Sequence, residues 1–209
     1  AGDEERRRAL SEDYGYAAVE SCAADSLCVT ACPVTIDTGA VMKRLRAEGH
    51  GAVAQRAGNA VARHWGTTVK AVRVALNTAH AVPSPVLRTA TGTLRRLGAG
   101  ELVPAWSDDI PKGGPARPAP GHPAGARAVF FAACIGSLFA PEEGGGERPG
   151  GATGAAAAFL RLCARAGVPV AVPPGLDGLC CGTPWQSKGY TAGYRTMAER
   201  TLEALWEAS

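Results

Sequence analysis

The chain has 209 residues, of which 46% are hydrophobic and 6% aromatic, and its formal net charge is +3 at pH 7. This length allows one or two domains with a buried core, and no run of about 18 uncharged apolar residues predicts a membrane-spanning helix. Residues 1–40 hold eight acidic residues and three arginines, whereas residues 41–100 hold ten Lys or Arg and one acidic residue. The basic segment suits an acidic redox partner or a peripheral contact with an anionic membrane surface, although a solvated helical face is the commoner reason for such a pattern. We predict no nucleic-acid partner.

The cysteines and the N-terminus indicate a reducing compartment. The chain has seven cysteines, an odd number, and a secreted disulfide framework favours an even set. Its first residues, AGDEERRRALSEDYGY, are too charged for a signal peptide. We therefore expect a cytoplasmic protein, or one at the cytoplasmic face of a membrane, whose cysteines serve metal or redox chemistry. The sequence does not begin with Met, and we expect it to be an internal fragment of a longer polypeptide.

The first half of the chain has a helical pattern. A helix over 39–48 follows Asp37 and Thr38, either of which suits an N-cap. Apolar residues then recur at helical spacing from 52 to 82. The prolines of VPSP, at 82–85, interrupt this pattern, and it resumes over 86–97.

The second half alternates between strand and helix patterns after a segment rich in Pro and Gly at 111–127, which predicts a semi-extended, unpacked linker. Strands are expected at 128–133 and 168–172. Helices are expected at 155–167, ended by Gly167, and at 191–208, with a mobile loop at 141–154. This order predicts parallel strand pairing in an α/β layer, and two strands alone make an unfinished sheet.

Three cysteines lie close together in CAADSLCVTACPVTIDTG, residues 22–39. Their spacing is Cys22-x5-Cys28-x3-Cys32-Pro33, and Asp25 stands where a second Cys would complete C-x2-C-x2-C-x3-C-P. That pattern ligates iron–sulfur clusters in bacterial ferredoxins, with the fourth Cys serving the other cluster. We predict that Cys22, Cys28 and Asp25 serve one cluster and Cys32 another. Because a carboxylate is a harder ligand than a thiolate, the cluster is either 4Fe-4S with carboxylate or water at one iron, or 3Fe-4S.

A second group of cysteines comprises Cys134 and the adjacent pair Cys180 and Cys181 in GLCCG. In the predicted layer these residues follow the carboxyl ends of neighbouring parallel strands, the edge at which ligand sites gather. We predict further metal ligands here, and the alternative is a set of buried thiols beside a turn. Cys163 is expected in the core, and the four histidines are assigned no role.

Both cysteine motifs resemble one family. YGYAAVESCAADSLCVTACPVTIDTG resembles the second iron–sulfur motif of FAD-linked D-lactate dehydrogenases, and DGLCCGTPWQSKGY resembles their cysteine-rich CCG domain, related to heterodisulfide reductase. The resemblance runs from about residue 14 to residue 209. It implies a helical ferredoxin-like module over 1–110, a linker over 111–127 and a partial CCG-type α/β module over 128–209, a fold class of α plus α/β.

The resemblance also implies a function. In that family an FAD domain, which would lie upstream of this chain, oxidises a 2-hydroxy acid, and electrons pass through the iron–sulfur region towards a quinone or a cytochrome. The upstream cysteine motif and a glycine-rich FAD-binding loop are absent here, so no catalytic residue is predicted in this chain. The alternatives are the iron–sulfur subunit of a heterodisulfide-reductase-like or glycerol-3-phosphate dehydrogenase complex, and a zinc-binding or thiol-only module.

Overall fold

The computed structural model describes residues 2–99, 103–141 and 154–209. Within these residues the chain is mostly helical, with one small parallel sheet of two strands, compatible at this coarse level with the predicted α plus α/β class. The chain divides into two compact units, one made of Ala1–Arg63 and Cys181–Arg200 and the other of His64–Cys180 and Thr201–Ser209. Whether 1–110 and 128–209 fold as the modules suggested by the family resemblance stays a prediction.

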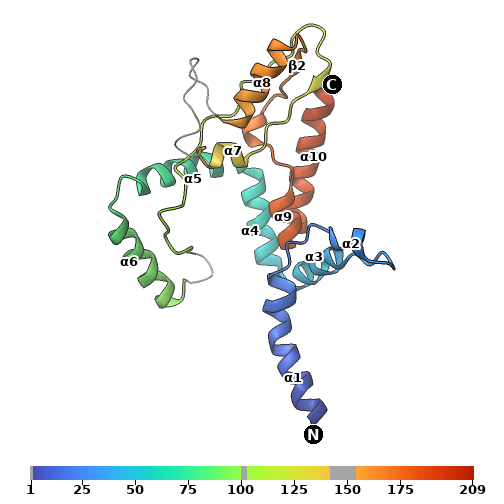
Figure 1. Cartoon of the computed structure of the whole chain (residues 1–209), viewed down its shortest axis with the longest axis vertical. Coiled ribbons are helices and arrows are strands. Elements are labelled where there is room, and N and C mark those ends of the chain that lie inside the picture. Colours follow the sequence, from blue (N-terminus) through green and yellow to red (C-terminus); the bar gives the residue numbers. More distant parts are fainter. Residues whose placement is uncertain (1, 100–102, 142–153) are drawn as a thin grey trace. The chain divides into compact units, whose positions relative to one another are not determined.

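The first unit is helical. Along the chain its elements are α1 (Gly2–Tyr14), the π-helical η1 (Gly15–Glu20), α2 (Cys28–Ala31), α3 (Thr38–Gly49), α4 (Ala52–Arg63), α9 (Thr183–Lys188) and the part of α10 (Thr191–Glu207) up to Arg200 (Figure 1). The predicted cap of α3 is confirmed, because the Asp37 carboxylate accepts a hydrogen bond from the Ala40 N–H at 2.9 Å. The cap fixes where α3 begins, directly after the cysteine motif.

Close contacts hold α4, α9 and α10 together. The Trp185 indole donates a hydrogen bond to the Gly58 carbonyl at 2.8 Å, and the Trp185 side chain is 3% exposed. A Cβ atom at Gly193 would overlap the Trp185 ring, and one at Gly58 would lie 2.8 Å from the Tyr190 ring. Both positions therefore need glycine for steric reasons, because side chains occupy the space that a Cβ would take.

The second unit contains the sheet. Its elements are α5 (Trp65–Ala79), α6 (Ser84–Leu94), the π-helical η2 (Arg95–Ala99), β1 (Ala128–Val129), α7 (Ile135–Leu138), α8 (Ala155–Arg165), β2 (Val170–Ala171), the 3-10 turn η3 (Leu176–Gly178) and the end of α10. The predicted parallel pairing is confirmed, with Ala128 opposite Val170 and Val129 opposite Ala171. Both strands are shorter than predicted, since only two residues of each form the ladder.

The sheet and α8 enclose a small core. Ala132, Val172 and Leu176 are buried, and Phe130, Phe131, Ala156 and Leu160 pack against them. As predicted, α8 ends just before Gly167, which takes a left-handed conformation with φ of +66°. The loop predicted over 141–154 lies, apart from its two end residues, outside the described residues.

Two expectations about the chain were wrong. The helical pattern over 52–82 is interrupted at His64, whose backbone leaves the helical region with φ of −106° and ψ of 26°. The segment 111–127 contains no helix, as expected, but it is packed: Gly113 and Gly121 form isolated bridges with Phe139 and Val172, and Arg117 is only 8% exposed. The Pro- and Gly-rich composition of 111–127 predicts a semi-extended backbone. It does not predict the hydrogen bonds to backbone carbonyls that hold Arg117 inside the unit.

Candidate functional site

The loops around the three clustered cysteines have an unusual backbone. Ala24, Ser26 and Thr35 all have positive φ, at 56°, 64° and 53°. Residues other than glycine rarely adopt this conformation, and for a β-branched residue such as Thr35 it is an outlier. Such conformations cluster at functional sites, where the surrounding structure holds them.

The strained backbone directs N–H groups at sulfur. The Ala24 N–H donates to Cys22 Sγ, and the Ile36 N–H donates to Cys32 Sγ, both over 3.4 Å. Amide hydrogen bonds to sulfur are one of the ways in which proteins tune iron–sulfur clusters. The two predicted ligands that flank the motif therefore lie in similar settings, partly exposed and accepting one amide each.

Cys28 is the most exposed of the three, at the start of α2. Its Sγ lies 2.8 Å from Thr38 Oγ1. This side-chain hydrogen bond, followed by that of the Gly39 backbone N–H, lowers the pKa of Cys28 below its ordinary value. A lowered pKa favours the thiolate, the form in which cysteine binds metals.

Asp25 is engaged locally. Its Oδ1 accepts a hydrogen bond from the Leu27 N–H at 3.1 Å, the pattern of an Asx turn. Within 2–99, 103–141 and 154–209, no three His, Cys, Asp or Glu side chains converge into a group that could hold a metal ion. The donor chemistry of the motif fits an iron–sulfur cluster, whereas the described residues do not by themselves provide a converged ligand set.

Arg46, on α3, holds the segment that enters the motif. Its guanidinium donates to the Cys22 carbonyl at 2.6 Å and to the Glu20 carbonyl at 3.1 Å. It also donates to the carbonyls of Val19 and Ser187. The role of Arg46 could not be predicted from the sequence, because its four acceptors are backbone carbonyls, which are present whatever the side chain is.

The second group of cysteines is brought together in part. Cys134 Sγ and Cys180 Sγ lie 3.6 Å apart, although 46 residues separate them along the chain. Cys180 is fully buried, and its carbonyl accepts a hydrogen bond from the Thr201 hydroxyl. Cys181 is exposed, and its thiol donates to Thr183 Oγ1 at 3.2 Å.

Arg117 lies beside the Cys134–Cys180 pair and was also missed. It donates to the carbonyls of Ala132 at 2.6 Å and Leu179 at 2.8 Å. The hydrogen bond with Cys180, and then the charge of Arg117, lower the pKa of Cys134 to about 6, against the opposing effect of burial. The lowered pKa favours the thiolate form of Cys134. In the sequence, only the position of Arg117 among the prolines of 115–120 could have indicated this role.

The seventh cysteine and two of the histidines lie apart from both cysteine groups. Cys163, expected in the core, is half-buried on α8. His50 stacks on Tyr190 with ring centroids 4.3 Å apart and contacts the Lys188 carbonyl. His80 contacts the Ile110 carbonyl in the same way.

Comparison with known proteins found no matching family model, no matching curated protein and no matching solved structure. In the part of the chain that the structure describes, no helix is long and apolar enough to cross a membrane.

Proposed function

We propose that this chain transfers electrons through iron–sulfur clusters within a flavin-dependent 2-hydroxy-acid dehydrogenase of the D-lactate type. The observation that carries the proposal is the pair of amide-to-sulfur hydrogen bonds at Cys22 and Cys32, in loops that contain non-glycine residues with positive φ. Buried structural thiols do not need such an environment, whereas cluster-bound sulfurs carry negative charge and accept amide hydrogen bonds.

In this proposal the residues of the motif divide between two clusters. Cys22 and Cys28, with Asp25, bind one cluster, and Cys32 binds another. The remaining ligands come from outside the described residues, from the segment of the same polypeptide that carries the FAD domain. A bound cluster supplies one-electron transfer. The lowered pKa of Cys28 supports its role as a thiolate ligand.

The proposed electron path ends on a quinone or a cytochrome at the cytoplasmic face of a membrane. The basic residues of 41–100 support a peripheral contact with anionic lipid, because polybasic surfaces are attracted to such membranes. The same motif suits a subunit of a heterodisulfide-reductase-like or glycerol-3-phosphate dehydrogenase complex. A second complete cysteine motif in a polypeptide without a flavin domain would favour that assignment.

The test uses the full-length polypeptide encoded by the gene. We expect iron, acid-labile sulfide and a brown colour that dithionite bleaches. Cys28→Ser should leave flavin reduction by D-lactate intact and block onward transfer to a quinone, while Cys163→Ser, on α8, should change neither. Unimpaired transfer in the Cys28 variant would remove this site from the electron path.

A second candidate is a thiol-only or zinc-binding module. The contact between the Cys134 and Cys180 sulfur atoms favours it. Because no three-ligand group converges among the described residues, the thiol-only form of this module fits them better than the zinc-binding form. Metal analysis separates the two candidates, since a colourless full-length protein that holds zinc, or no metal, would support this module and refute electron transfer.

A further inference from the structure

The second unit contains a cavity of about 950 Å³ that the cysteine motifs do not account for. Three segments line it: 115–119, 130–137 and the first turns of α8. Neither Cys134 nor Cys180 lines the cavity, although Cys134 lies between two lining residues, Ala133 and Ile135. This volume is at the upper end of those that bind a small molecule.

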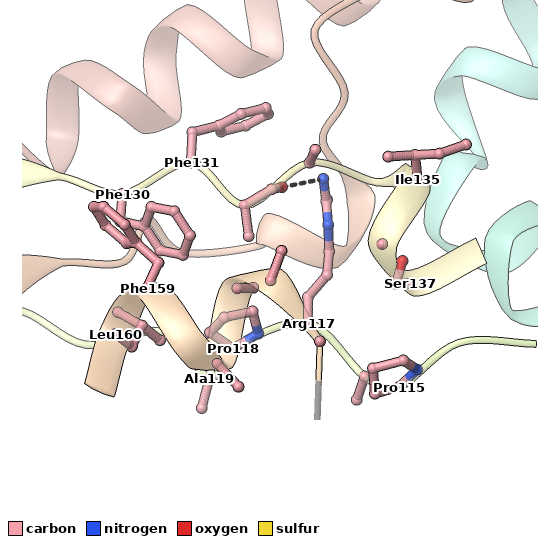
Figure 2. A pocket seen from close by; sticks show the side chains of 18 of the residues that line it. Pro115, Arg117, Pro118, Ala119, Phe130, Phe131, Ile135, Ser137, Phe159 and Leu160 are labelled. Atoms are coloured by element: carbon pink, nitrogen blue, oxygen red, sulfur yellow. Dashed lines mark hydrogen bonds between the residues drawn. The ribbon is translucent and has the colours of Figure 1, made fainter. Parts of the chain in front are cut away.

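Aromatic rings and small side chains shape the walls. Phe130 and Phe159 stack with centroids 4.5 Å apart and an interplanar angle of 28°, and Figure 2 shows both rings at one end of the cavity. Alanine and glycine contribute most of the remaining wall, including Ala155, Ala156 and Ala157 on α8. A wall of flat rings and short side chains favours a flat, aromatic ligand.

The charges that line the cavity are positive. Arg117 and Arg161 are its only charged lining residues among those that the structure describes. Arg117 is 8% exposed, with its guanidinium carbon 5.7 Å from the centre of the Phe131 ring, and Figure 2 shows its hydrogen bond to the Ala132 carbonyl. Arg161 is exposed on α8. A guanidinium has five N–H donors, so an arginine with existing partners can bind a further anionic group. A mainly apolar site with arginine donors therefore favours a ligand that carries a negative group.

We propose that this cavity binds a small aromatic molecule bearing one anionic group, such as an aromatic carboxylate or sulfonate. The aromatic body packs against Phe130, Phe131 and Phe159, and the anionic group lies near Arg161. This inference goes beyond the proposed electron transfer and does not depend on it, because no predicted cluster ligand lines the cavity.

The test compares two fluorescent probes that share one aromatic skeleton. 1-Anilinonaphthalene-8-sulfonate carries the anionic group, and N-phenyl-1-naphthylamine lacks it. With the metal-free full chain, we expect saturable binding of the sulfonate at one site per chain, with blue-shifted emission, and weaker binding of the neutral amine. Binding at many sites, or equal affinity for both probes, would overturn the proposal.

Two pairs of variants on α8 locate the site. Ala157→Trp fills the cavity and should weaken sulfonate binding by tenfold or more, roughly the effect of overpacking, whereas Ala158→Trp, on the exposed side of the same helix, should not. Arg161→Gln should weaken it about threefold and leave the amine unaffected, while Arg165→Gln should change neither. The arginine pair keeps the proposal testable if tryptophan disturbs folding, and equal effects within either pair would refute it.

Discussion

Replacing Arg46 with Met tests whether this residue holds the segment that leads into the cysteine motif. Met keeps much of the length of the aliphatic stem and removes every donor. The substitution removes the hydrogen bonds that Arg46 donates to the carbonyls of Cys22, Glu20, Val19 and Ser187. The matched control is Arg44→Met on the same helix, where the side chain is 81% exposed and forms an ion pair with Glu48.

The expected loss of stability follows from the number and burial of these bonds. One hydrogen bond to a charged group contributes about 1.5–3 kcal/mol. Arg46 is partly buried and makes several hydrogen bonds of this kind. Water can solvate some of the carbonyls that the substitution frees, so the summed energy of these bonds overstates the loss of stability. We therefore expect the free energy of unfolding to fall by about 2–4 kcal/mol. The control should leave it nearly unchanged, because exposed ion pairs contribute little.

Urea denaturation followed by circular dichroism measures this difference, and maleimide labelling of Cys22 in native conditions provides a local reading. Labelling of Cys22 should be faster in the Arg46 variant than in the wild type, since the loop that contains the thiol loses its anchor. Equal stability of the Arg46 and Arg44 variants would refute the role assigned to Arg46. Unchanged labelling would limit that role to global stability.

The remaining predictions concern titration. In the metal-free chain, alkylation of Cys134 by iodoacetamide should be half-maximal near pH 6, so that about 90% of this thiol is ionised at pH 7, against a few per cent for an ordinary cysteine. Cys180→Ser should move this midpoint to higher pH and Cys163→Ser should not, as measured by peptide mass spectrometry; a wild-type midpoint above pH 8 would contradict the pairing. Asp37→Ala should lower the melting temperature, because the cap of α3 is lost, whereas Asp37→Asn should retain the part of the stabilisation that comes from an uncharged side-chain oxygen. The pKa of Asp37 is lowered, chiefly by the Ala40 N–H, so its stabilisation is present above about pH 4 and is lost as the pH falls through the folded pKa. The difference between the wild type and the Ala variant should therefore shrink in acid to the difference between the Asn and Ala variants, and a constant difference down to pH 2 would argue against a charged cap.

Local features of the sequence determined where most of the regular elements lie. Asp37 caps α3 through a bond to a residue three positions away, Gly167 follows the end of α8, and the apolar pattern from Thr191 marks α10. These features depend on neighbours in the chain, so pattern and spacing suffice to predict them. The parallel pairing of β1 with β2 was also predictable, because a helix between two strands allows little else.

Only the tertiary structure decided which side chains meet. Cys134, Cys180 and Cys181 were predicted at one edge of the sheet, but only the fold shows that Cys180 meets Cys134 while Cys181 is exposed. Arg46 and Arg117 bind backbone carbonyls, which every residue carries and no sequence pattern marks. The packing of Arg117 overrode the local preference of a Pro- and Gly-rich segment for an unpacked conformation for the same reason. Long-range contacts are set by burial and geometry, whereas the sequence displays only composition and spacing.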